Sequence, residues 1–226
     1  VRQINEVYFA MLWILLQVGV ALAALRFALA LLTRRRHRQT CATMVVLGSG
    51  GHTAEMLRLF KNFDASVYRP RVYVAAATDA LSGVKATAFE KAWAGIPGKG
   101  SDPSGPAYQQ AVIPRSREVG QSWTSSALST AHAMLCALAL VFRARPDLVL
   151  VNGPGTCIPV CLSALLARML GVATAKIVYV ESIARVYRLS LSGKILYHAR
   201  LASIFFVQWP ELQAKYPRSV LAGRLM

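Results

Sequence analysis

Short apolar runs rich in β-branched residues alternate with longer helical stretches over most of this chain. The apolar runs predict strands at Met44–Leu47, Val72–Ala76, Ala111–Ile113, Leu148–Val151, Ile177–Val180 and Ile204–Val207. The stretches between them predict helices at Ala54–Lys61, Leu81–Trp93, Ser125–Arg145, Ile158–Leu170 and Lys194–Leu201. Strands that are apolar throughout and separated by helices are typical of a parallel sheet covered on both faces. The sequence therefore predicts a Rossmann-like, doubly wound α/β domain.

An uncharged apolar stretch, Val7–Leu25, precedes this domain. About 19 helical residues span roughly 28 Å, which is close to the hydrocarbon thickness of a bilayer. A further apolar run and the basic cluster Arg34–Arg38 follow, so we predict a single transmembrane helix with a cytoplasmic stop. The length and the basic flank disfavour a cleaved signal peptide or a buried core helix. The predicted parts are a lumenal N-terminus (1–6), an anchor (7–32), a basic linker (33–42) and a cytosolic domain (43–226).

The charge balance excludes some classes of protein. The chain has 26 Lys and Arg against 10 Asp and Glu, a net charge of +16, and 55% hydrophobic residues, which excludes a disordered chain. Beyond the basic cluster the cations are scattered, so a domain held against an anionic membrane is favoured over nucleic-acid binding. The four cysteines are too few and too irregular for a disulfide framework. Cys157 with Cys161, and His132 with Cys136, lack zinc-site spacing, so we expect packing cysteines, no metal and no cofactor.

A glycine-rich turn follows the first predicted strand and leads into a helix. It comprises Gly48, Ser49, Gly50, Gly51, His52 and Thr53. Glycines let backbone N–H groups approach a ligand closely, and a helix N-terminus adds partial positive charge. Position 53 is threonine where the dinucleotide fingerprint needs its third glycine, and the P-loop pattern is nowhere satisfied. We predict contact with a phosphate or diphosphate, with an ordinary tight turn as the alternative.

Further polar residues follow the other predicted strands, at the edge where ligands of such sheets bind. The fourth strand runs into a second turn, which is made of Asn152, Gly153, Pro154, Gly155 and Thr156. Arg115 and Arg117 follow the third strand and suit diphosphate oxygens, although an ordinary solvated loop also explains them. Glu181 follows the fifth strand, and it and His52 are the side chains there that can exchange a proton near neutral pH.

Several segments, most of them around these residues, together carry a family resemblance. They are Gly48–Leu57 (GSGGHTAEML), Ile113–Trp123 (IPRSREVGQSW), Pro146–Pro159 (PDLVLVNGPGTCIP), Val178–Arg185 (VYVESIAR), Leu189–Leu196 (LSLSGKIL) and Phe206–Pro210 (FVQWP). In this order they closely resemble the membrane-anchoring subunit of the two-subunit enzyme that adds the second N-acetylglucosamine to the dolichol-linked oligosaccharide precursor of protein N-glycosylation. The resemblance covers nearly all of residues 43–226 and includes the anchor.

The resemblance implies a fold and a partner. The family is one half of a split, inverting glycosyltransferase of the two-domain GT-B type, similar to the bacterial enzyme that glycosylates the lipid II precursor. This chain would supply the acceptor-side domain, and a separate cytosolic catalytic subunit would supply the domain that binds UDP-N-acetylglucosamine. About 190 cytosolic residues make one such domain, which agrees with a half enzyme. The partner would dock at residues 219–226, although a terminal strand explains that tail equally well.

The resulting hypothesis places the chain at the cytosolic face of the endoplasmic reticulum, with GlcNAc-diphosphodolichol as the acceptor. The Gly48–Thr53 turn, the second turn and Arg115 or Arg117 would bind the diphosphate, and Glu181 or His52 would be the base for the acceptor O4 hydroxyl. One alternative is a pure tether that recruits a catalytic partner and contacts no substrate. A nucleotide-binding oxidoreductase is disfavoured by the missing third glycine.

Overall fold

The structure is a computed structural model, which describes residues 40–94, 108–115 and 123–225, with side chains from 129 onward in the last range. It also describes helical residues between 11 and 28, with single positions left out. Among the residues described, no helix combines the length and the apolarity that crossing a membrane requires. The anchor predicted at residues 7–32 falls partly outside the described residues and stays a prediction, as does the rest of the division of the chain.

All the strands of the described domain run parallel in one seven-stranded sheet of order β3-β2-β1-β4-β5-β6-β7. The strands are β1 (Thr43–Val46), β2 (Arg71–Ala76), β3 (Tyr108–Ile113), β4 (Leu148–Val151), β5 (Lys176–Val180), β6 (Ile204–Val207) and β7 (Val220–Leu221). The helices are α2 (Gly51–Phe60), α3 (Ala80–Ala94), α4 (Trp123–Ala144), α5 (Cys157–Met169), α6 (Leu191–His198) and α7 (Pro210–Lys215). The predicted doubly wound α/β fold is therefore confirmed.

The strand order reverses beside β1. The chain passes from β1 to β2 on one side, and later returns to place β4 on the other side, so Val45 pairs with both Tyr73 and Leu150. The carboxyl ends of β1 and β4 consequently lie side by side at the point where ligands of open α/β sheets bind. Both glycine-rich turns begin at these two strand ends.

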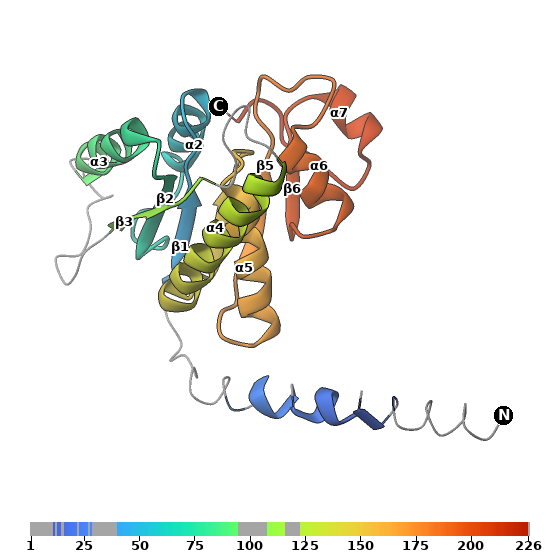
Figure 1. Cartoon of the computed structure of the whole chain (residues 1–226). Coiled ribbons are helices and arrows are strands. Elements are labelled where there is room, and N and C mark those ends of the chain that lie inside the picture. The colour runs from blue at the N-terminus through green and yellow to red at the C-terminus, as the bar shows by residue number, and fades with distance from the viewer. Residues whose placement is uncertain are drawn as a thin grey trace.

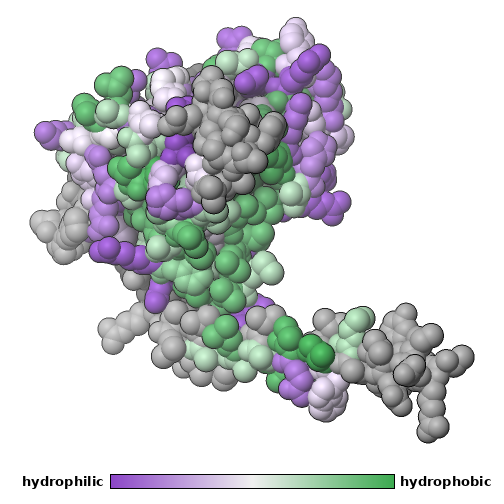
Figure 2. Space-filling model, in the orientation of Figure 1, coloured by the Kyte–Doolittle hydropathy of each residue, from purple (hydrophilic) through white to green (hydrophobic). Residues whose placement is uncertain are grey.

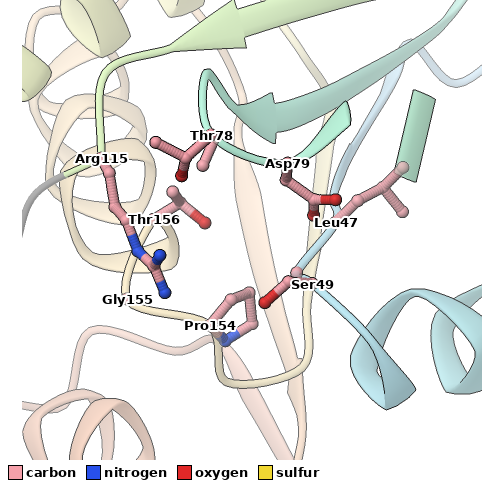
Figure 3. A pocket seen from close by; sticks show the side chains of 10 residues that line it. Leu47, Ser49, Thr78, Asp79, Arg115, Pro154, Gly155 and Thr156 are labelled. Carbon is pink, nitrogen blue, oxygen red and sulfur yellow. The ribbon is translucent and has the colours of Figure 1, made fainter. Parts of the chain in front are cut away.

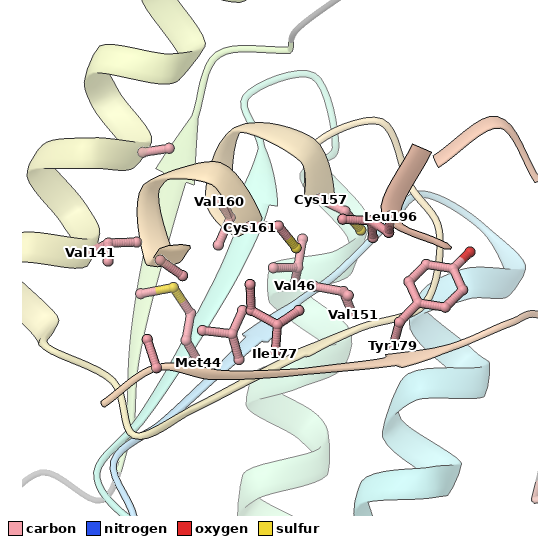
Figure 4. Close-up of a cluster of buried hydrophobic side chains, with 14 of the residues drawn as sticks. Met44, Val46, Val141, Val151, Cys157, Val160, Cys161, Ile177, Tyr179 and Leu196 are labelled. Carbon is pink, nitrogen blue, oxygen red and sulfur yellow. The ribbon is translucent and has the colours of Figure 1, made fainter. Parts of the chain in front are cut away.

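Two layers of helices enclose the sheet, and each layer has its own core (Figure 1). In one layer, α4 and α5 cover side chains of the central strands such as Met44, Val46 and Ile177 (Figure 4). Cys157 and Cys161 are fully buried in this core, which confirms them as packing cysteines. Burial raises the pKa of the Cys157 thiol to about 12, so it stays protonated and apolar at neutral pH.

The opposite layer packs α2 and α3 against the sheet through an aromatic cluster. Phe60, Tyr73 and Trp93 are buried together, with the Phe60 and Trp93 ring centroids 5.3 Å apart. Beside them the guanidinium of Arg71 binds the carboxylate of Glu90 through two hydrogen bonds of 2.6 and 2.8 Å. Because both ions are almost fully buried, this pair fixes β2 against α3. Arg71 is the first residue of β2, so the link fixes the amino end of this strand.

Of the two short elements near the C-terminus, the sequence pattern missed α7 and gave β7 only as one of two interpretations of the tail. Helix α7 has only six residues and begins at Pro210, and a helix of that length is too short to show a period of 3.6 residues. Strand β7 contributes two residues, which pair with β6 at Phe206 and Val207. The terminal-strand interpretation of residues 219–226 is thus confirmed for Val220–Leu221, whereas partner docking by this tail stays a prediction.

Candidate functional site

A cavity of about 160 Å³ opens at the carboxyl ends of β1, β2 and β4 (Figure 3). Its walls come from the two glycine-rich turns, the end of β2 and the residue after β3. They comprise Leu47, Gly48, Ser49, Ala76, Thr78, Asp79, Arg115, Pro154, Gly155 and Thr156. The structure brings together five residues that the sequence predicted as ligand-binding: Gly48, Ser49, Arg115, Gly155 and Thr156.

The two turns touch because Gly48 has no side chain. A Cβ atom at this position would lie 2.5 Å from the Cβ of Pro154, which is closer than such atoms approach, and 3.2 Å from the Cβ of His52. The side-chain amide of Asn152 donates a 2.7 Å hydrogen bond to the carbonyl of His52, which ties the second turn to the first. Asn152 is fully buried and His52 half-buried, so this bond is partly shielded from water. The turns therefore form one rigid unit.

Thr53 stabilises the first turn from the buried side, away from the cavity. Its hydroxyl donates to the carbonyl of Gly48 at 2.7 Å and lies 2.6 Å from the hydroxyl of Ser82. The Ser82 hydroxyl in turn donates to the Asp79 carboxylate at 2.6 Å, and Asp79 lines the cavity. Because Thr53 is fully buried and its hydroxyl is occupied, the structure places it under the turn and not among the cavity-lining residues. Gly50 and Gly51 lie exposed at the start of α2, with Gly50 at φ +70°, a conformation that favours glycine.

His52 lies between the two turns. It is half-buried on the first turn of α2, and it packs close to Gly153. A Cβ on Gly153 would lie 3.6 Å from the His52 ring carbon Cε1 and 3.2 Å from the hydroxyl of Tyr179. Gly153 also has φ +108°, so a side chain there would be strained as well as crowded. Glycine at this position lets the His52 ring and the end of β5 come together.

Buried polar atoms without hydrogen-bond partners gather around this edge of the sheet. Within the described part of the chain they include Nδ1 of His52, Oε2 of Glu55, Oδ1 of Asn152 and Oγ1 of Thr156. Buried polar groups in folded proteins are nearly always hydrogen-bonded, because an unpaired one costs free energy. Three of these atoms belong to the two turns, and the fourth belongs to Glu55 on α2. Of the four, the Thr156 hydroxyl is the one that belongs to a residue lining the cavity, where it can donate to a ligand. Glu55, one helical turn after His52, was not predicted from the sequence.

Glu181 is fully buried at the end of β5, and both of its carboxylate oxygens are occupied. Oε1 accepts from the backbone N–H of Ser182 at 3.1 Å, and Oε2 accepts from the N–H and the hydroxyl of Ser190 at 2.9 and 3.2 Å. Burial raises the pKa of this carboxyl, and the hydrogen bonds from Ser190 and Ser182 lower it in part. The carboxylate thus holds both ends of the loop 182–190 and does not line the cavity.

The same network fixes the start of α6. The Ser190 hydroxyl caps the helix by accepting from the N–H of Gly193 at 3.0 Å, and it lies 2.8 Å from the Tyr179 hydroxyl. A Cβ on Gly193 would lie 2.5 Å from Oε2 of Glu181, so only glycine fits there. The Ser182 hydroxyl donates to Oε1 of Glu55 at 2.9 Å, which extends the network to α2. Sequence spacing could not show these contacts, because they join residues far apart in the chain.

The cavity is lined by one cation, Arg115, and one carboxylate, Asp79, whose oxygens accept from the N–H and the hydroxyl of Ser82. Figure 3 shows the exposed side chain of Arg115 extending toward the turn that contains Gly155. Helix α2 begins in the first turn, and α5 begins directly after the second. The N-terminus of each helix attracts negative charge. Arg117 lies outside the described residues. Among the residues that the structure covers, no three His, Cys, Asp or Glu side chains are placed to hold a metal ion.

Comparison with known proteins shows the family to which this chain belongs. The family model described as "Oligosaccharide biosynthesis protein Alg14 like" matches residues 43–225. The human protein named UDP-N-acetylglucosamine transferase subunit ALG14 is 50% identical over 191 residues, which cover 84% of this chain and 85% of the human one. The Yarrowia lipolytica protein of the same name is 41% identical over 183 residues, which cover 81% and 80% of the two chains. The resemblance found in the sequence motifs is confirmed.

A solved structure shows the same fold. The crystal structure of Acinetobacter baumannii MurG superimposes with a TM-score of 0.51 at 16% sequence identity. The likeness covers 76% of this chain but only 42% of the MurG chain, so this chain spans less than half of that protein. At this identity the likeness concerns the fold alone, and it confirms that the sheet and its helices form a known kind of domain.

Proposed function

The chain belongs to the Alg14-like family of oligosaccharide biosynthesis proteins, and from this premise we propose that it is the acceptor-binding subunit of a UDP-N-acetylglucosamine transferase. The acceptor is GlcNAc-diphosphodolichol, and a separate cytosolic subunit binds the donor and completes the catalytic cleft. The observation that carries this proposal is the cavity at the strand-order reversal, where Arg115, the unpaired hydroxyl of Thr156 and the N-termini of α2 and α5 come together. A pure tether would not need such a site.

The acceptor diphosphate suits the cavity better than other parts of the substrate do. The diphosphate oxygens can accept hydrogen bonds from N–H and hydroxyl groups of Ser49, Gly155 and the first turns of α2 and α5. Arg115 supplies a cation beside them. The oxygens would also accept from the unpaired hydroxyl of Thr156. Arg117 would approach the same diphosphate from the segment after β3. The volume of the cavity is too small for a whole lipid-linked sugar, so the GlcNAc unit would extend toward the partner's side.

Of the two candidate bases, His52 fits the geometry better. An inverting transfer needs a base that takes the proton of the acceptor O4 hydroxyl. The half-buried ring of His52 adjoins both turns and has an unpaired Nδ1, whereas Glu181 is fully buried with both oxygens bonded. We therefore assign the base to His52 and give Glu181 a positioning role: it holds loop 182–190 and the start of α6 against the second turn.

The membrane supports this chemistry because the acceptor's lipid stays in the bilayer. We propose that residues 7–32 anchor the chain in the endoplasmic reticulum membrane, with the domain in the cytosol. The cluster Arg34–Arg38 would then lie at the anionic cytosolic surface. The anchor confines the search for acceptor to two dimensions and recruits the cytosolic subunit to the membrane. The tail 219–226 remains the proposed docking site for that subunit.

A transfer assay with separated components tests this function. Membranes carrying this chain receive radiolabelled UDP-N-acetylglucosamine and a GlcNAc-diphospho-lipid acceptor, with or without the candidate cytosolic partner. We expect labelled product only when both chains are present. Product from this chain alone would mean that one domain holds a complete active site. Equal product from the partner alone would mean that this chain has no part in the reaction.

A further inference from the structure

The loop 182–190, which follows β5, carries positive charge that nothing in the segment offsets. It includes Arg185 and Arg188, and both side chains are exposed. The chain has no Asp or Glu between Glu181 and Glu211. Figure 2 shows hydrophilic side chains gathered over the part of the molecule where Figure 1 labels α7, the helix that packs beside this loop. We call Arg185 and Arg188 the loop arginines.

Several elements of the fold hold the backbone of this loop in place. Besides the bonds to β5 and α2 described above, the indole N–H of Trp209 donates to the carbonyl of Ile183 at 2.7 Å. In α7, Nζ of Lys215 donates to the carbonyl of Tyr187 at 3.1 Å. A charged group on a backbone that is already fixed needs little reorganisation when a ligand of opposite charge arrives. The loop arginines therefore extend from a preorganised support.

The loop begins on the side of the site that lies away from the cavity. The cavity is at the carboxyl ends of β2, β1 and β4, and β5 is the next strand in the sheet. Neighbouring strands lie about 4.8 Å apart, so β5 is roughly 10 Å from β1. His52 lies between the two turns, and Ser182, the first residue of the loop, bonds to Glu55 one helical turn after His52. Across the sheet the order is therefore the cavity, His52 and the loop.

The proposed transfer determines where the diphosphate of the donor must lie. The acceptor O4 forms a bond to C1 of the donor sugar while the bond from C1 to the diphosphate oxygen breaks. The electron pair of the broken bond leaves with UDP, and the O4 proton passes to His52. The reacting atoms approach to about 3–3.5 Å, and in an inverting transfer the leaving group departs from the face of C1 opposite to O4. With the acceptor diphosphate in the cavity and its sugar at His52, the donor diphosphate lies beyond His52, on the side of the loop.

We propose that the loop arginines bind the diphosphate of the donor, so that this chain supplies part of the site for a nucleotide that the partner subunit holds. The inference rests on the proposed transferase function and adds to it, because that function leaves the donor to the partner. Guanidinium groups bind phosphate oxygens through charge-assisted, often bidentate hydrogen bonds. Negative charge grows on the diphosphate as the bond to C1 breaks, so cations fixed beside it stabilise the transition state more than the ground state.

The test compares a nucleotide that has the diphosphate with a nucleoside that lacks it. The full chain carrying Arg185→Gln and Arg188→Gln together is assembled with its partner subunit, and binding of radiolabelled UDP and of uridine is measured by equilibrium dialysis. We expect the affinity for UDP to fall roughly tenfold or more, as loss of charge-assisted bonds would cause, and the affinity for uridine to stay the same. The value of kcat/KM for the donor should fall with the UDP affinity, while the KM for the acceptor stays the same. The matched control is Arg58→Gln, which removes an exposed arginine from the last turn of α2 and should change neither affinity.

Three results would overturn the proposal. An unchanged UDP affinity would mean that the loop arginines do not meet the donor, and equal losses for UDP and uridine would mean that they only support the structure. Weaker assembly of the two chains, with normal UDP binding by the complex that does form, would mean that the loop is a docking surface. Replacing both arginines with lysine keeps the charge and should restore part of the UDP affinity. Absence of product from the unaltered pair would contradict the proposed function, whereas product with an unchanged donor dependence in the double variant would contradict the loop site alone.

Discussion

Replacing His52 with alanine should lower the turnover of the assembled transferase by about 10²–10⁴-fold, the usual contribution of a general base. The KM for the lipid acceptor should change little, because the proposed diphosphate contacts come from residues of the turns and from Arg115, which line the cavity. Removal of the ring leaves the backbone of the turn intact, since the carbonyl of His52 still accepts from Asn152. Initial rates at saturating acceptor and donor measure the effect.

The matched control for this variant is His198→Ala. His198 is exposed in the last turn of α6, far along the chain from both turns, and its loss should leave turnover unchanged. If His52→Ala kept most of the turnover while folding normally, the base would have to be another group. The Glu55 carboxylate, one turn further along α2 with an unpaired oxygen, would be the next to change.

Replacing Glu181 with alanine should destabilise the domain by about 2–4 kcal/mol, because it leaves the buried N–H groups of Ser182 and Ser190 without acceptors. For a domain of this size that corresponds to a fall in Tm of roughly 4–16 °C. Glu181→Gln should lower the free energy of unfolding by less, because a carboxamide oxygen still accepts from one N–H while its NH₂ group faces the other. Thermal unfolding of the full chain in detergent measures both variants.

A positioning role and a base role for Glu181 predict different kinetics. If the carboxylate only holds loop 182–190, Glu181→Gln should raise the KM for the acceptor more than it lowers kcat, and the pH profile of kcat should keep its shape. The control variant for stability is Glu211→Ala, which removes an exposed carboxylate from the first turn of α7. It should lower the free energy of unfolding by less than about 1 kcal/mol. A normally stable Glu181→Gln protein whose kcat fell by 10²-fold or more would return the base role to Glu181.

The strands of this domain were predictable because most of them are buried on both faces. Apolar runs such as Leu148–Val151 and Ile204–Val207 match β4 and β6 residue for residue. Strand β3 begins three residues before the predicted run, at Tyr108. It is an edge strand with exposed Gln109 and Gln110, so its first half lacks the apolar signal on which the prediction depended.

Those parts of the site that consist of glycine-rich turns at strand ends were predictable from the sequence. Gly48, Ser49, Gly155 and Thr156 were found because parallel strands bring their carboxyl ends to one edge. Sequence alone could not rank His52 against Glu181, since burial and hydrogen bonding distinguish them and neither is visible in spacing.

Other contributors to the site were missed for a related reason. Asp79 lines the cavity and supports the first turn through Ser82, and Glu55 meets Ser182 from another helix. The contact of Glu55 with Ser182 joins residues that only the folded sheet brings together. Asp79 instead accepts from Ser82 three positions later, a local contact at the start of α3 that marks a helix start and not a cavity. Nothing in the local pattern around either carboxylate marks it as part of a site.

The central claim is that this chain itself binds the acceptor, and direct binding by the chain alone tests it most closely. The full chain in vesicles, without the partner subunit, is titrated with a GlcNAc-diphospho-lipid of short chain length and, separately, with UDP-N-acetylglucosamine. We predict saturable binding of the lipid-linked acceptor that inorganic diphosphate competes away and that Arg115→Ala weakens about tenfold, as loss of one charge-assisted hydrogen bond would. The donor should bind much more weakly. Tighter binding of the donor, or no acceptor binding by a chain that still supports transfer with its partner, would contradict the account.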